Sequence, residues 1–271
     1  MADITAKLVN DLRAKTGQGM MECKKALQET GGDVEKAIDY FRQKGVKTSL
    51  TERVAGEGRV IGAQSPDKKS AALVEVNCNT DFTAKSEPVQ KLGATAASAL
   101  LKSGGANISE DAQVKANLTT VAQTTGENVQ IGKTAVLSNP SGTVGLYQYG
   151  ITGKIGVIMS FNGGSPSDEL IKQLGGHIAF ARPVALTRAE VPADLVARER
   201  EIGVEQAKAT GKPQQIAEKI AEGKLNSFFA ERVLLDQEFF NAQVFKGSIA
   251  NYLKQNGVTL EKYVRIEVGQ A

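Results

Sequence analysis

The spacing of hydrophobic residues near the start of the chain predicts three short helices. Ile4, Leu8 and Leu12 recur at every fourth position, which places them on one face of a helix. A Gly-rich break follows, and Asp33 is expected to cap the third helix. The apolar positions of the second and third helices are Met20, Cys23, Leu27, Val34, Ala37, Ile38 and Phe41. We therefore expect a three-helix domain at 1–45, followed by a linker at 46–56.

From residue 57 the hydrophobic period changes from that of a helix to two, which is typical of strands. The first predicted core subdomain spans 57–140. Its predicted elements are strands at 58–63 and 71–77, one helix from about 81 to 102, a helical segment at 109–125 and an extended segment at 128–138.

A second unit of two strands and a helix follows at 143–181. Four apolar residues of its second strand alternate onto one face, and Ser165, Pro166 and Asp168 predict a helix capped by Ser165 that runs to about Ala181. Residues 172–179 resemble 90–97 at an offset of 82 positions. We therefore expect a duplicated β-β-α module and an α+β core with antiparallel sheets. The four alternating residues are Ile155, Val157, Met159 and Phe161.

Residues 192–240 are rich in charge and predict two helices. Leu195, Ile202 and Ala209 repeat every seven positions, and a Gly-Lys-Pro turn follows. This pattern indicates an antiparallel coiled-coil hairpin that projects from the core. The rest of the second core subdomain is expected at 141–191 and 241–271, with a final helix at 248–255 and a strand whose Val264, Ile266 and Val268 share one face.

The composition restricts the class of protein. Hydrophobic residues make up 41% and charged residues 23% of 271 positions, which is typical of a globular protein, and no apolar run is long enough to span a membrane. The start of the chain has no secretion signal, and two cysteines fit a reducing compartment, so we expect a cytoplasmic protein. Basic and acidic residues interleave to a net charge of +3, and aromatic residues are 5%, so direct nucleic-acid binding is not expected.

Catalytic chemistry has little support in the sequence. His177 is the single histidine and lies in an apolar run, which favours a packed residue over a catalytic one. With two cysteines 55 positions apart, no zinc-type cluster is expected. Residues 126–134 resemble a phosphate-binding loop, but five residues separate the two glycines where that motif has four. We therefore expect no catalytic residue, no metal and no cofactor.

Nine segments, in order along the chain, resemble bacterial elongation factor Ts. The most specific are TGQGMMECKKAL at 16–27 and EVNCNTDF at 75–82. The others lie at 32–38, 126–128, 155–157, 177–179, 211–213, 218–225 and 265–269. The resemblance covers nearly the full chain.

The resemblance implies a guanine nucleotide exchange factor that binds elongation factor Tu in its GDP-bound and nucleotide-free states. It implies a ubiquitin-associated-like domain at the N-terminus, the duplicated core and the hairpin. By motif, Thr80, Asp81, Phe82 and Thr83 form the segment that disturbs the partner's magnesium site. The implied partner contacts are Arg13, Met20, Met21, Gly126 and His177.

The sequence departs from the family pattern in four places. Thr83 replaces a usual Val, Asn79 stands where Glu or Gln is common, and Tyr149 stands where a histidine is expected. The sequence also stops at Ala271, where some relatives continue into a helix that touches the partner, so we expect that contact to be missing.

The residues themselves give further expectations. Phe82 follows three cap-forming residues at the end of a strand, so we expect it to point outward from the first turn of a helix, with Asp81 as a possible N-cap. One of Met20 and Met21 should pack inward, and Cys23 and Cys78 should be buried. Two other functions stay open: a binding adaptor based on residues 1–45, and a nucleotide-binding enzyme based on 126–134.

Overall fold

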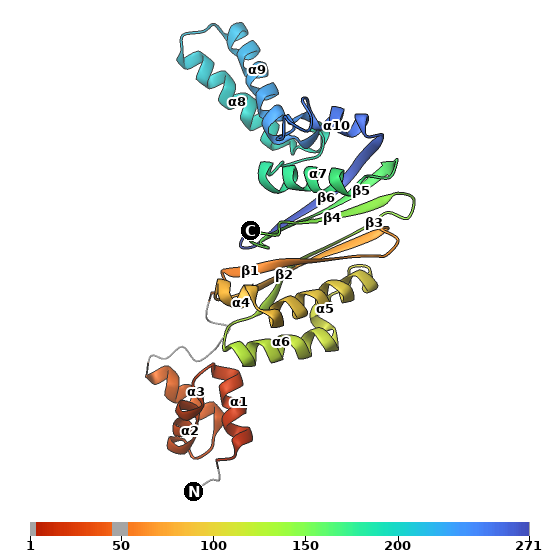
Figure 1. Ribbon diagram of the computed structural model, residues 1–271. Helices are drawn as coiled ribbons and strands as arrows, with labels where there is room; N and C mark the ends of the chain where they lie inside the picture. Colours follow the sequence, from red (N-terminus) through yellow and green to blue (C-terminus); the bar gives the residue numbers. More distant parts are fainter. Residues whose placement is uncertain (1–3, 45–53, 271) are drawn as a thin grey trace.

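The computed structural model describes residues 4–44 and 54–270 and shows a layered, elongated molecule (Figure 1). Two three-stranded antiparallel sheets lie face to face at its centre, and helices cover the outer face of each. A cluster of three helices lies at one end and a helical hairpin at the other. The α+β fold that the sequence predicts is confirmed, whereas the exact domain boundaries stay a prediction.

The N-terminal cluster consists of α1 (Ala6–Thr16), α2 (Met20–Glu29) and α3 (Val34–Gln43). Asp33 caps α3 as predicted, because its Oδ1 accepts hydrogen bonds from the backbone N–H groups of Glu35 and Lys36. The small shared core is formed by Val9, Leu12, Cys23, Ala26, Leu27, Ala37 and Phe41. The predicted linker lies outside the described residues except at 54–56.

The first sheet has the order β1-β2-β3, and its outer face packs on α5. The single helix expected at 81–102 is in fact two helices, because Ser86 is extended and Pro88 follows it. Proline lacks an N–H group and its ring clashes with the preceding helical turn, so one helix cannot run through this point. The elements are β1 (Glu57–Gln64), β2 (Ser70–Cys78), α4 (Asp81–Lys85), α5 (Glu87–Ser103), η2 (Ile108–Glu110), α6 (Ala112–Thr125) and β3 (Gln130–Ser138).

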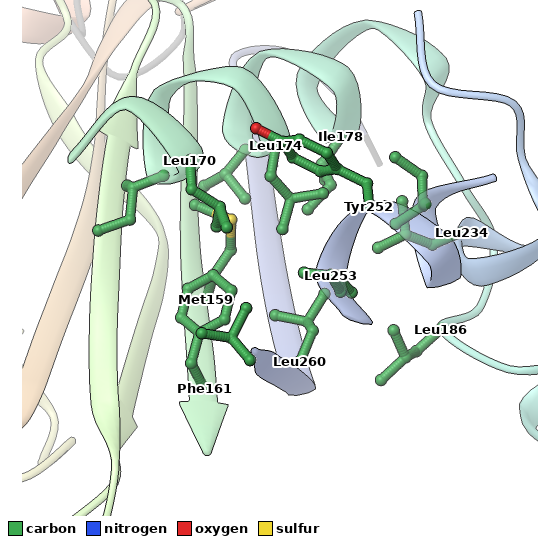
Figure 2. Close-up of a cluster of buried hydrophobic side chains, with 14 of the residues drawn as sticks. Met159, Phe161, Leu170, Leu174, Ile178, Leu186, Leu234, Tyr252, Leu253 and Leu260 are labelled. Carbon is green, nitrogen blue, oxygen red and sulfur yellow. The ribbon is translucent and has the colours of Figure 1, made fainter. Parts of the chain in front are cut away.

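The second sheet repeats this arrangement, with the order β4-β5-β6 and a helix after its second strand. Figure 2 shows Leu170, Leu174 and Ile178 of that helix, α7, packing over Met159 and Phe161 of β5. The helix begins two residues later than predicted, because Ser167 rather than Ser165 is its N-cap. The elements are β4 (Thr143–Gln148), β5 (Ile155–Gly163), α7 (Asp168–Ala181), α10 (Ile249–Gln255) and β6 (Val258–Glu267).

The inner faces of the two sheets form a separate core. Val60, Leu73 and Leu137 of the first sheet pack with Val144, Ile158 and Ile266 of the second. Val264 and Val268 join this core, as their alternation with Ile266 predicts. Each sheet therefore buries both faces, one against helices and one against the other sheet.

The hairpin consists of α8 (Ala193–Ala209) and α9 (Gln214–Arg232), which run antiparallel away from the sheets (Figure 1). The predicted seven-residue seam is wrong, because Ile202 and Ala209 are exposed. Small residues fill the seam instead, and a Cβ atom at Gly203 would lie 3.0 Å from Cα of Ala221. The buried seam residues are Gly203, Ala207, Ala217, Ala221 and Leu225, and the short helices η3 (Arg188–Glu190) and η4 (Leu234–Asp236) flank the base.

No helix among the described residues has both the length and the apolar character needed to cross a membrane.

Candidate functional site

The junction between β2 and α4 presents an exposed phenylalanine. Thr80 is the N-cap of α4, and its Oγ1 accepts a hydrogen bond from the backbone N–H of Thr83. Phe82 is therefore the second residue of the helix, and 82% of its surface is exposed. The prediction that Phe82 points outward from a first helical turn is confirmed. The underside of α4 is anchored by Thr83 and Ala84, which are buried.

A carboxylate from a distant part of the chain lies under this junction. Oε2 of Glu127 accepts hydrogen bonds from the backbone N–H groups of Asn79 (2.9 Å) and Thr80 (3.1 Å). Oε1 accepts from the hydroxyl groups of Thr80 and Thr83, each at 2.7 Å. Burial favours the neutral acid, but these hydrogen bonds outweigh it, so the pKa of Glu127 is lowered and the carboxylate stays charged.

Asp81 does not cap the helix, contrary to the sequence interpretation. Thr80 holds that position, and Asp81 instead pairs with Lys85 one turn later, with 2.7 Å between Oδ2 and Nζ. The hydrogen bond from Lys85 lowers the pKa of Asp81. Both side chains are largely exposed, so the pair stabilises the helix only slightly. Thr83 faces the other way, inward to Glu127, so of the four predicted residues it presents the least surface.

The N-terminal helices present a second exposed apolar site. Met20 and Met21 are 54% and 75% exposed, so the prediction that one of them packs inward is wrong. The buried face of α2 is already filled by Cys23, Ala26 and Leu27, and neither methionine lies on it. Adjacent flexible thioether side chains on the surface are well suited to a binding patch.

Two further predicted residues meet between the N-terminal cluster and the first half of the core. Arg13 of α1 and Gly126, which ends α6, both line a cavity of about 300 Å³ together with Asn10, Gly17 and Gln123. Gly126 has φ +69° and directly precedes Glu127. The Phe82 junction and the Arg13 surface are therefore joined through the 126–127 segment.

His177 lies apart from these residues, on α7 over the other sheet, and only 3% of it is exposed. Its Nδ1 accepts from the backbone N–H of Phe240 (3.3 Å), which leaves the proton on Nε2 to be donated to Oε1 of Gln237 (2.9 Å). Burial lowers the pKa of His177. His177 therefore presents little surface of its own, and its contact with a partner stays a prediction; the exposed side chain beside it is Phe240.

Tyr149, at the position where the resemblance leads us to expect a histidine, makes an edge-to-face contact with Phe180 at 5.0 Å between ring centroids. Phe180 is exposed and belongs to the same helix as His177. An aromatic ring thus takes the place of the expected imidazole at this surface.

The chemistry available to an enzyme is sparse in the described residues. No group of three or more histidine, cysteine or acidic side chains there could hold a metal ion. Cys23 and Cys78 are buried as predicted, and burial raises the pKa of Cys78 to about 11, which disfavours its thiolate form. The segment that resembles a phosphate loop runs from the end of α6 into β3, whereas a phosphate loop leads from a strand into a helix.

Sequence reasoning did not identify Glu127 as part of the site. It is 44 to 48 positions away from its hydrogen-bond partners, and no local pattern links them. The only signal was its place in the 126–128 segment of the family resemblance.

Comparison with known proteins supplies the family. The family model described as Elongation factor TS matches residues 79–270. A protein named Elongation factor Ts from Thioalkalivibrio sulfidiphilus is 39% identical, covering 98% of this chain and 92% of the relative. Proteins of the same name from Photorhabdus laumondii and Gluconobacter oxydans are each 38% identical over the whole chain, covering 94% and 93% of the relatives.

Proposed function

The chain belongs to the elongation factor Ts family of translation factors, and we propose that it is a guanine nucleotide exchange factor for elongation factor Tu. In this proposal it binds the GDP-bound partner, disturbs the partner's Mg²⁺ site, promotes GDP release and remains on the nucleotide-free form. The observation that carries the proposal is the rigidly mounted, exposed Phe82.

Phe82 acts as a wedge in this mechanism. An aromatic ring that is exposed in the free protein gains apolar burial only when a partner covers it, so its insertion between partner side chains is favourable. The insertion shifts the groups that hold Mg²⁺, and the phosphates of GDP then lose part of their charge neutralisation. GDP binds less tightly and dissociates faster.

The two binding events are linked in thermodynamic terms. If the chain binds nucleotide-free partner more tightly than GDP-bound partner, it must weaken GDP binding by the same factor. Local strain at the wedge is offset by binding elsewhere, for which we propose Arg13, Met20, Met21 and the surface at Gly126. His177 contributes indirectly, by holding the backbone of Phe240.

We propose no catalytic chemistry and no cofactor for the chain itself, and action in the cytoplasm without direct binding to nucleic acid or membrane. An adaptor without exchange activity would also use residues 1–45, but it gives no reason for the exposed Phe82. Equilibrium dialysis of the chain with GDP tests the alternative of a nucleotide-binding enzyme, which predicts stoichiometric micromolar binding.

Release of fluorescent GDP from elongation factor Tu, with and without the chain, tests the function. The proposal predicts that catalytic amounts of the chain accelerate release at least tenfold, an effect equal to about 1.4 kcal/mol of barrier or more. Unchanged release in the presence of a complex would favour the adaptor and contradict the exchange function.

A further inference from the structure

We propose that Glu127 is a positioning residue for exchange, which fixes the direction of Phe82 and joins it to the Arg13 surface. The inference rests on the proposed exchange function and concerns how the wedge is held. Glu127 touches no partner in this account and acts only through the β2–α4 junction.

The carboxylate of Glu127 accepts four hydrogen bonds, two on each oxygen, which is the number that a carboxylate can accept. Two donors are the backbone N–H groups of Asn79 and Thr80, directly after the end of β2, and two are hydroxyl groups, one of them on α4. Bonds to a charged acceptor are stronger than neutral ones, and four of them converge on a single group. Strand, cap and helix are therefore fixed to the same carboxylate.

The junction needs such a device because α4 has only five residues. Isolated helices of this length are unstable in water. Only Thr83 and Ala84 of α4 are buried, and Phe82 itself contributes little burial in the free protein. Packing alone therefore fixes α4 weakly against a force applied at the exposed ring.

The backbone that carries Glu127 is itself well anchored. Glu127 directly follows Gly126, which ends the fourteen-residue helix α6 in a left-handed conformation. A second tie lies beside it, because Oδ1 of Asn79 accepts a hydrogen bond from the backbone N–H of Asn128 at 2.8 Å. Asn79 also donates from Nδ2 to the carbonyl oxygen of Val54. Hydrogen bonds thus connect the segment that carries Phe82 to the end of α6, and the end of α6 lines the cavity that contains Arg13.

A loose wedge predicts a specific kinetic defect. The chain would still bind through its other surfaces, but the ring would relax instead of displacing the partner's groups. The maximal rate of GDP release at saturating chain would fall, while the concentration for half-maximal effect would change little. A residue that matters only for folding would lower the amount of active protein and leave this maximal rate per folded molecule unchanged.

The test measures GDP release from elongation factor Tu against the concentration of Glu127→Ala. We expect the maximal rate to fall by about tenfold and the half-saturation concentration to change by less than about threefold. Glu127→Gln should restore most of the rate, since its amide can accept from the two backbone N–H groups and donate to the two hydroxyls. Glu110→Ala, which breaks only an exposed ion pair with Lys115, is the matched control and should behave as wild type.

A double variant shows whether Glu127 acts through the ring. In the Phe82→Ala background, adding Glu127→Ala should slow release by less than about twofold, because the group that it positions is already gone. The inference would be overturned if the two substitutions slowed release independently, so that their fold-changes multiplied in the double variant. A wild-type maximal rate for Glu127→Ala would also overturn it. If Glu127→Ala does not fold, Thr83→Val provides the test, because it removes only the hydrogen bond from the Thr83 hydroxyl to Glu127. Loss of this bond should lower the maximal rate about twofold, and an unchanged rate would overturn the inference.

The outcomes also separate this inference from the proposed function. No acceleration by the wild-type chain would refute the exchange function. Acceleration that depends on Phe82 but not on Glu127 would refute only the positioning role.

Discussion

Gly93 of α5 and Gly175 of α7 hold matching places in the two halves of the core. A Cβ atom at Gly93 would lie 2.4 Å from Cδ1 of Ile61 on β1, and one at Gly175 would lie 2.4 Å from Cβ of Tyr147 on β4. Each glycine lets its helix approach the first strand of its sheet. Both belong to the segments whose similarity predicts the duplication, and the shared packing supports it.

Gly175→Ala should therefore destabilise the fold. The added methyl group meets Cβ and Cγ of Tyr147, which are close to the backbone and cannot move away freely. Overpacking of this kind costs about 1–3 kcal/mol, which lowers the melting temperature by several degrees in a chain of this size. Calorimetry measures the effect. Gly223→Ala in α9, where a Cβ atom meets nothing within 4 Å, is the control and should be neutral or stabilising; equal melting temperatures for the two variants would contradict the packing argument.

Because the chain has a single histidine, His177, its contribution to the pH dependence of stability can be measured. The pKa of His177 in the folded chain is lowered by burial, below about 6.5 for the unfolded chain. Its contribution to stability is complete above about pH 6.5 and is lost as the pH falls toward the folded pKa, because the unfolded chain takes up the proton first. Protonation would also place a donor on Nδ1 against the N–H of Phe240.

Thermal unfolding of wild type and His177→Gln between pH 7.5 and 5 checks this expectation. The wild-type melting temperature should fall more steeply than that of the variant, since all other titrating groups are shared. Parallel curves would show that the buried imidazole does not contribute to the pH dependence.

The hairpin should be separable from the core. The base of the hairpin packs on the core through residues at the start of α8 and the end of α9. Along the rest of their length, α8 and α9 mainly contact each other. Replacing residues 198–224 with a short Gly/Ser loop should leave the melting temperature of the core within a few degrees and weaken the complex with elongation factor Tu. Loss of the cooperative transition would show that the arm is structural. The base residues that the replacement keeps are Leu195, Val196, Phe228 and Phe229.

The two exposed methionines should affect binding without affecting folding. Met20→Ala and Met21→Ala remove side chains that contribute little burial, so each should change the free energy of unfolding by about 0.5 kcal/mol or less. Each should raise the dissociation constant of the partner complex several-fold, as measured by calorimetric titration. Leu27→Ala, on the buried face of α2, is the contrast and should cost about 2–5 kcal/mol. Unchanged affinity of the double methionine variant would remove this patch from the interface.

Features set by neighbouring residues could be predicted from the sequence. The cap at Asp33, the alternation in β5 and β6, and the outward position of Phe82 all depend on spacing within a few residues. The break between α4 and α5 at Ser86 also had a local signal, because Pro88 is unfavourable inside a helix. The helical pattern of the residues on both sides obscured this signal.

Features set by distant parts of the chain could not be predicted. Glu127 reaches the Phe82 junction only because β3 pairs with β2 and brings the end of α6 beside it. The hairpin seam uses mainly glycine and alanine, because the two helices lie too close at Gly203 for a larger side chain. The seven-residue repeat through Ile202 and Ala209 therefore marked an exposed face. His177 is held in the interior by contacts with Gln237 and Phe240, which lie 60 and 63 positions later in the chain.

Phe82→Ala is the most direct test, measured both by calorimetry and by release of fluorescent GDP from elongation factor Tu. Because Phe82 is exposed, its loss should change stability by about 0.5 kcal/mol, whereas Phe161→Ala in the buried core should cost about 3–5 kcal/mol. The complex should still form through the other surfaces, and the maximal rate of GDP release should fall by at least about tenfold. A wild-type release rate, or a drop in melting temperature as large as that of Phe161→Ala, would contradict the assignment of Phe82 as the wedge.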